Sequence, residues 1–146
     1  MEYVLKTYGK LDVLINNAAA GYLSGDDPLS VIHPYLSVNF YGVKNLTEGF
    51  LELIPDGGHI INVSALLGLP SYLKDEKLGV FLGNPELSLQ SLLEKVREFE
   101  GLGGDWKEKG WKLEGPGVYG TTKAFLNAYS MILHRELTLL NNILQS

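Results

Sequence analysis

Two short apolar runs, separated by one long helical stretch, constrain the fold of this chain more than any other feature. The first run, residues 11–17 (LDVLINN), ends in asparagines, and the second, residues 59–64 (HIINVS), follows the turn Pro55-Asp56-Gly57-Gly58. Continuous apolar runs of this length are typical of buried parallel strands. A strand, a crossover helix and a second strand form a parallel, right-handed unit in nearly all known cases. We therefore predict an α/β fold with two neighbouring parallel strands.

The stretch between the two runs begins with strong helix signals. Asp27 is a good N-cap residue, and Pro28 suits the first helical position. Apolar residues continue to about Ile54 and predict one long amphipathic helix. This apolar stripe consists of Val31, Ile32, Tyr35, Leu36, Val38, Val43, Leu46, Phe50 and Leu53.

The second half of the chain contains a segment of different character. Residues 69–115 mix Gly, Pro, Lys and Glu, and we interpret them as an insert within a single domain that spans residues 1–146. Asn84-Pro85-Glu86 is a start signal for one helix in the insert, and Gly101 predicts its end. Its apolar face consists of Leu89, Leu92, Leu93, Val96 and Phe99. A last helix, mostly buried, is predicted from Gly117 to about Asn141.

Composition excludes several classes of function. The formal net charge is -5 and the 12 Lys and Arg residues are scattered, so a nucleic-acid partner is not expected. The chain has no cysteine, and its three histidines, His33, His59 and His134, are too far apart in sequence to suggest a metal site. Neither a secretory signal nor a membrane-spanning run is found. We expect a globular, soluble, cytoplasmic protein with no membrane partner.

Tyr119 and Lys123 are the first candidates for chemistry. They lie four residues apart on a predicted helix, so their side chains leave the same face one turn apart. A nearby ammonium makes a phenol a stronger acid, which suits a general acid for the reduction of a carbonyl group. Among eight tyrosines, this one alone has a lysine four residues later, which favours a role for the pair. The alternative is that packing and solvation alone place the two residues there.

Ser64 and Asn39 are further candidates, each with a structural alternative. Ser64 lies at the carboxyl end of the second predicted strand, where open α/β sheets bind their ligands, and its hydroxyl could polarise a carbonyl group. The alternative is a serine that bonds to local backbone. Asn39 is an amide in an apolar stretch, and a buried polar group without partners costs about 1 to 3 kcal/mol. It is either functional or a satisfied amide of the core.

Four motifs, taken in order, resemble those of the short-chain dehydrogenase/reductase family. They are Asn16-Asn17-Ala18-Ala19 closing the first strand, Asn39 within the helix, Ser64 after Ile60-Ile61-Asn62-Val63, and Tyr119-Gly120-Thr121-Thr122-Lys123 opening the last helix. The likeness extends from about Leu11 to Leu137. It implies a partial Rossmann-like, doubly wound parallel sheet, with central strands and long helices only and with a helical insert at residues 69–115.

The long interval between Ser64 and Tyr119, which contains the insert, resembles the carbonyl reductase branch of the family. Gly110-Trp111 before the tyrosine and the run Val118 to Lys123 are similar to that branch as well. The resemblance implies NADPH-dependent reduction of small carbonyl substrates (ketones, aldehydes and quinones) to alcohols by the complete form. It also implies a monomer, because such an insert covers the helical face through which other members dimerise.

The same resemblance assigns roles to the motif residues. Tyr119 would protonate the carbonyl oxygen, and Ser64 would hold that oxygen in place. Lys123 would make Tyr119 a stronger acid and bond the nicotinamide ribose, while Asn39 would anchor a water of the proton relay. Asn16, Asn17, Ala18 and Ala19, together with Tyr119 and Lys123, would line the cofactor.

The chain also departs from the family pattern. It has no Thr-Gly-x-x-x-Gly-x-Gly turn for the pyrophosphate, Ala19 stands where the family usually has glycine, and the chain stops after the Tyr119 helix. We therefore expect the chain alone to be inactive, and its unpaired strand edges to favour self-association or binding to a partner. The alternatives are a noncatalytic remnant that serves as an interaction subunit, and a family member that acts on sugars or acyl thioesters.

Overall fold

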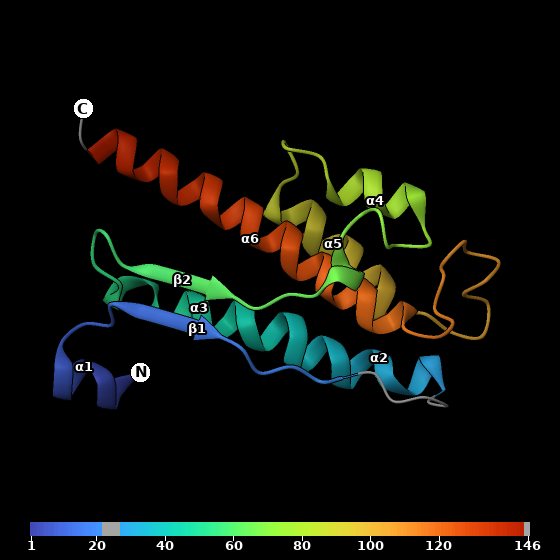
Figure 1. The fold of residues 1–146 in the computed structure, drawn as a ribbon, viewed down its shortest axis with the longest axis horizontal. Helices are drawn as coiled ribbons and strands as arrows, with labels where there is room; N and C mark the ends of the chain where they lie inside the picture. Colours follow the sequence, from blue (N-terminus) through green and yellow to red (C-terminus); the bar gives the residue numbers. More distant parts are fainter. Residues whose placement is uncertain (22–26, 145–146) are drawn as a thin grey trace.

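The computed structural model describes residues 1–21 and 27–144, with side chains as far as residue 140. Within this part of the chain, no helix is both long enough and apolar enough to cross a lipid bilayer. The elements follow in the order α1 (Glu2–Tyr8), β1 (Val13–Asn16), α2 (Pro28–Leu36), the π-helical turn η1 (Ser37–Gly42), α3 (Val43–Phe50), the 3-10 turn η2 (Leu51–Leu53), β2 (His59–Asn62), the 3-10 turn η3 (Leu66–Gly68), α4 (Glu76–Leu82), α5 (Leu89–Glu100) and α6 (Gly117–Leu144) (Figure 1).

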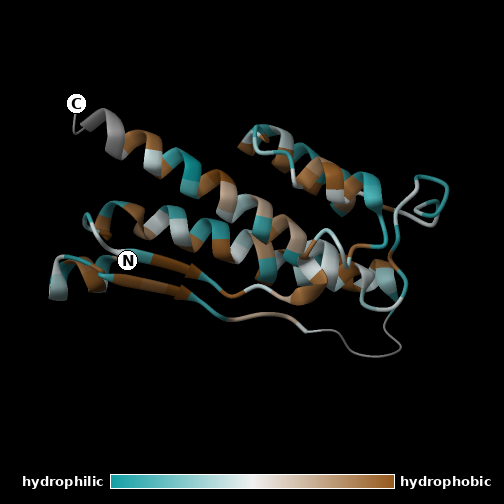
Figure 2. Ribbon diagram, turned by 45° about the horizontal axis from the view of Figure 1, so that its top comes forward, coloured by the Kyte–Doolittle hydropathy of each residue, from teal (hydrophilic) through white to brown (hydrophobic). Residues whose placement is uncertain are grey.

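The two predicted strands form a parallel pair, which confirms the α/β fold class. Val13 pairs with His59 and Asn16 with Asn62, so the carboxyl ends of both strands lie at the same edge. Helices α2, α3 and α6 all lie on one side of this pair (Figure 1). The apolar side chains of the other side are exposed, and Figure 2 shows the brown strands without helical cover there. These side chains are Val13, Ile15, Ile61 and Val63.

The first crossover helix begins where the sequence predicts, but it is not a single α-helix. The Asp27 carboxylate accepts a hydrogen bond from the Ser30 backbone N–H at 3.1 Å, and the π-helical turn η1 then interrupts the helix. The predicted apolar stripe is wrong at Val38 and Leu46, which are 39% and 46% exposed. Both lie outside the line of residues that this helix buries. That line runs through Ile32, Leu36, Phe40, Val43 and Thr47.

The segment 69–115 contains a helix that the sequence reasoning missed and another that starts later than expected. Helix α4 is capped by Asp75, whose carboxylate accepts from the Leu78 N–H at 3.0 Å. Helix α5 starts after Ser88, whose hydroxyl accepts from the Ser91 N–H at 3.1 Å. Asn84 instead caps a turn by accepting from the Glu86 N–H.

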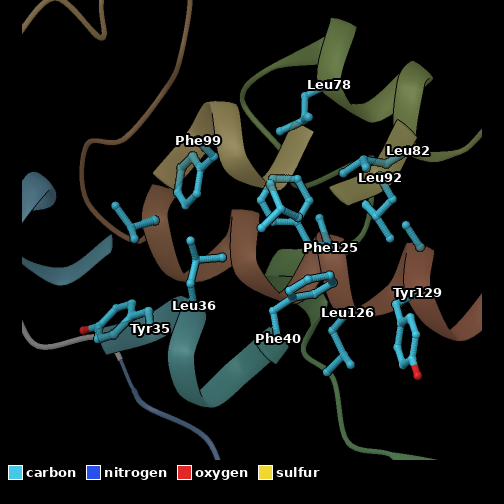
Figure 3. Packing of buried hydrophobic residues seen from close by; sticks show 14 of the residues in the cluster. Tyr35, Leu36, Phe40, Leu78, Leu82, Leu92, Phe99, Phe125, Leu126 and Tyr129 are labelled. Atoms are coloured by element: carbon cyan, nitrogen blue, oxygen red, sulfur yellow. The ribbon is translucent and has the colours of Figure 1, made fainter. Parts of the chain in front are cut away.

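An aromatic core joins η1, α5 and α6. The Phe125 ring lies edge-on to Phe40 at 6.1 Å and to Phe99 at 5.6 Å, and Tyr129 packs against Phe40 at 6.2 Å (Figure 3). All four side chains are buried. Edge-to-face aromatic pairs add stability beyond the burial of their area, so α6 is held firmly against both neighbours.

Two glycines bring the chain that leaves β2 into direct contact with α6. A Cβ atom at Gly68 would lie 2.7 Å from the Lys123 carbonyl carbon, and one at Gly120 would lie 2.8 Å from the Leu67 carbonyl oxygen. No side chain fits at either distance without a shift of the backbone. The contact therefore requires glycine, and it sets the distance between η3 and the first turns of α6.

We expect Gly68→Ala to lower the free energy of unfolding by about 1 to 3 kcal/mol, because the added methyl group overlaps the α6 backbone. Urea denaturation followed by circular dichroism measures the loss. Gly49→Ala is the matched control, since this α3 glycine has nothing within 4 Å of the added atom. In a helix that substitution is neutral or stabilising, by up to about 1 kcal/mol. Equal losses in both variants would contradict the close contact.

Candidate active site

Ser64 lies just beyond β2, at the carboxyl edge of the strand pair. The Val63 N–H still donates to the Asn16 carbonyl at 3.0 Å, which continues the strand pairing up to this point. The half-buried Ser64 hydroxyl donates to the Lys123 carbonyl over 3.5 Å, at the upper limit for a hydrogen bond. A hydroxyl held this loosely is available to a ligand.

Tyr119 and Lys123 lie in the first two turns of α6. The half-buried Tyr119 ring meets the Tyr35 ring edge-on, at 6.4 Å between centroids and an interplanar angle of 89°. The Lys123 ammonium nitrogen lies 5.9 Å from the centroid of the Tyr119 ring. The helix thus brings the phenol and the ammonium together, as their spacing predicts.

Lys123 is an unusually buried cation. Its side chain is only 2% exposed, and its Nζ donates to the Val63 carbonyl at 2.9 Å. None of the ion pairs formed by the described residues includes it. Burial disfavours the charged form and lowers the pKa of Lys123 below its usual value. An ammonium has three N–H donors, so Lys123 can also bond a ligand at this edge.

Asn39 is fully buried in η1, and protein atoms occupy most of its hydrogen-bonding capacity. Its Oδ1 accepts from the Ala20 N–H at 2.8 Å, and its Nδ2 donates to the Ala20 carbonyl and to the Thr122 hydroxyl, each at 3.1 Å. Asn39 is therefore a satisfied core amide. A lone pair on Oδ1 remains for a water, so the relay role stays a prediction.

The four residues Asn16 to Ala19, at the end of β1 and just beyond it, divide between two environments. The Asn16 side chain faces the helices, and its Nδ2 donates to the Thr47 hydroxyl at 3.0 Å and to Asn62 Oδ1 at 2.8 Å. Asn17, Ala18 and Ala19 are exposed at the carboxyl edge of the strand pair. A ligand at this edge would meet those three residues, and would meet Asn16 through its backbone only.

The arrangement offers a hydroxyl, a phenol and an ammonium at one edge of the sheet, beside an exposed turn. Preorganised donors of this kind stabilise negative charge that develops on an oxygen atom. The set fits the nicotinamide and ribose end of a dinucleotide. The sequence contains no glycine-rich turn for the phosphates. In the described part of the chain, no three His, Asp or Glu side chains are close enough to hold a metal ion.

Sequence reasoning missed two residues that support this site. Thr122 accepts a bond from Asn39, and Asn62 joins Asn16 to the Ser130 hydroxyl, to which its Nδ2 donates at 2.8 Å. Asn62 lies opposite Asn16 in the strand register, which the sequence analysis did not predict. The Thr122 contact could not be predicted either, since Asn39 is 83 residues away in sequence.

Known proteins resemble the chain in sequence and in fold. The sequence profile of the short chain dehydrogenase family matches residues 1–74. Carbonyl reductase [NADPH] 1 of Mus musculus is 32% identical over 93% of this chain and 50% of its own length. Salutaridine reductase of Papaver bracteatum is 29% identical over 93% of this chain and 55% of its own length.

Solved structures show the same fold. Menthone neomenthol reductase from Mentha piperita superposes with a TM-score of 0.79 and 23% identity, over 92% of this chain and 60% of its own. Salutaridine reductase from Papaver somniferum gives a TM-score of 0.77 and 24% identity, over 94% and 59%. The chain spans about half the length of the curated relatives it matches. On the strength of the profile match and of this partial Rossmann fold, the chain belongs to the short-chain dehydrogenase/reductase family of oxidoreductases.

Proposed function

We propose that this chain carries the catalytic half of an NADPH-dependent carbonyl reductase, which converts ketones, aldehydes and quinones to alcohols. One observation carries the proposal: the buried Lys123 ammonium lies beside the Tyr119 ring, at the edge of the sheet where Ser64 presents its hydroxyl. The names of relatives, among them Carbonyl reductase [NADPH] 1 of Mus musculus, support the substrate class and the cofactor.

Each group has a distinct task in this proposal. Ser64 donates to the substrate carbonyl oxygen, and Tyr119 delivers a proton to the same oxygen as negative charge develops there. Lys123 places a positive charge beside the Tyr119 ring and bonds the nicotinamide ribose. Asn39 offers its remaining lone pair to a water that returns a proton to the site. Bound NADPH supplies the hydride chemistry.

The cofactor would lie against Asn17, Ala18 and Ala19, whose exposure supports contact with a ligand. Asn16 would support this turn from below. We further propose that residues 1–146 form one partial Rossmann-type domain with residues 69–115 as its insert. Contact between Phe99 of the insert and Phe125 of α6 supports a shared core. A monomeric complete form and a cytoplasmic location stay predictions.

A second candidate function is that of a noncatalytic interaction subunit. The exposed apolar side of the strand pair, with Val13, Ile15, Ile61 and Val63, favours this alternative. The same exposed apolar side would also cause the isolated chain to self-associate. The experiments below separate the two functions, because an interaction subunit needs neither Tyr119 nor a cofactor.

We expect the purified 146-residue chain to bind NADPH weakly or not at all, because it lacks a glycine-rich turn for the pyrophosphate. Isothermal titration calorimetry measures the affinity directly. Binding with a micromolar dissociation constant would overturn this expectation.

Tyr119→Phe should abolish carbonyl reduction and leave affinity for NADPH nearly unchanged, because it removes the proton donor and little else. For this assay, residues 1–146 replace the aligned half of Carbonyl reductase [NADPH] 1 of Mus musculus, which supplies the remainder of the fold. Oxidation of NADPH with a quinone or an aromatic aldehyde gives the rate. Tyr8→Phe is the control, since Tyr8 is exposed on α1. If the Tyr119 variant keeps most of its turnover, the assignment is wrong.

Lys123→Met should stabilise the isolated chain by about 1 kcal/mol, because a buried charge without an acidic partner is replaced by an apolar side chain of similar length. Burial lowers the pKa of Lys123 in the folded chain, so wild type carries the full penalty at pH values below that lowered pKa. The penalty decreases as the pH rises from the lowered pKa toward 10.5, the pKa in the unfolded chain, because Lys123 loses its proton in the folded chain first. Thermal unfolding at several pH values measures the difference in stability between the variant and wild type, and this difference should narrow as the pH rises. A variant that is less stable than wild type at neutral pH would contradict this account.

A further inference from the structure

We propose that Thr122 is a positioning residue for the Tyr119 general acid, which it links to the Asn39 amide. This inference rests on the proposed reductase function. Thr122 lies between Tyr119 and Lys123 in sequence, on the side of α6 that faces η1. It touches no reacting atom, and it acts through the helix turn that carries the phenol.

The Thr122 hydroxyl is fully buried and has two partners. It donates to the Tyr119 carbonyl at 2.8 Å and accepts from Asn39 Nδ2 at 3.1 Å. A hydroxyl has one proton, so donation to Tyr119 leaves its lone pairs to face Asn39. The two bonds therefore run in one direction, from the amide through the hydroxyl to the carbonyl.

Asn39 cannot turn its amide around in this arrangement. Its Oδ1 accepts from the Ala20 N–H, and its Nδ2 donates to the Ala20 carbonyl, so a flipped amide would oppose donor to donor and acceptor to acceptor. The second Nδ2 proton must then point at Thr122. As a result the loop after β1, the π-helical turn η1 and the first turns of α6 are joined through buried polar atoms.

This link complements the glycine contact on another side of the same turn. Gly120 lies against the Leu67 carbonyl and allows α6 to approach η3 closely. Thr122 fixes the turn relative to η1 and to the exposed residues that precede Ala20. Because small displacements of a reacting group can cost up to about a hundredfold in rate, a side chain that locates this turn affects catalysis without contact with the substrate.

The neighbouring Thr121 provides a matched comparison. It is also buried, at 4% exposure, but it lines a small hollow together with Leu67 and Trp111 instead of facing Asn39. Thr121→Val and Thr122→Val thus remove the same hydroxyl from adjacent buried positions. Thr122→Ser keeps the hydroxyl and loses only the methyl group.

The first test uses nuclear magnetic resonance on the 146-residue chain. Thr122→Val should shift the Asn39 Nδ2 proton resonances and weaken the cross-peaks between the Tyr119 and Tyr35 rings. Thr122→Ser and Thr121→Val should leave both signals as in wild type. Unchanged signals in Thr122→Val, or the same changes in Thr121→Val, would overturn the proposal. Circular dichroism confirms that each variant is folded.

The second test measures kinetics in the chimeric carbonyl reductase described above. Thr122→Val should lower kcat by about tenfold or more, with the KM for NADPH changed less than about twofold, and Thr122→Ser should restore most of the rate. Thr121→Val should match wild type. Full activity of Thr122→Val, or no recovery in Thr122→Ser, would overturn the proposal. If the wild-type chimera is inactive, the proposed reductase function fails instead, and the resonance experiment still decides whether Thr122 positions the turn.

Discussion

The candidate site depends on the close contact between the chain that leaves β2 and the first turns of α6. Gly68 and Gly120 permit backbone to lie on backbone, and this brings Ser64 to the carbonyl of Lys123. The same contact places the Val63 carbonyl where it accepts a hydrogen bond from the Lys123 ammonium. A strand end and a helix start, far apart in sequence, thereby contribute to one set of donors. A bulkier residue at either glycine would move Ser64 away from the Lys123 carbonyl without changing either side chain.

Buried side-chain hydrogen bonds hold the other side of the site. Asn39 binds both backbone groups of Ala20, while Asn16, Asn62 and Ser130 form a chain of bonds from β1 through β2 to α6. A buried amide is costly if it loses its partners, so each of these groups strongly favours one arrangement of its neighbours. The polar residues beneath the sheet therefore specify geometry, whereas the aromatic core of η1, α5 and α6 buries large apolar rings.

The sequence predicts local features well and long-range contacts poorly. Apolar runs locate both strands, and Asp27-Pro28 locates the start of α2, because these signals arise within a few residues. The π-helical turn η1 has no comparable signature, and α4 is too short for its apolar period to be recognised. Tyr119 and Lys123 meet as predicted, since one helical turn separates them. The inward orientation of Asn16 and the Thr122 partner of Asn39 depend on packing between distant segments, which spacing alone does not encode.

Helix α6 changes its surroundings along its length. Its early residues, such as Phe125, are fully buried, whereas Leu139 and Leu140 are more than half exposed. Between these regions, the Arg135 guanidinium donates to the Pro85 and Leu87 carbonyls and ties α6 to the loop before α5. Cooperative units of different stability follow from such a gradient. The first turns of α6, which carry Tyr119 and Lys123, should unfold only with the whole molecule, while the turns beyond Arg135 open locally. A protease would then cut α6 near Leu139 and leave Tyr119 and Lys123 in a folded remainder.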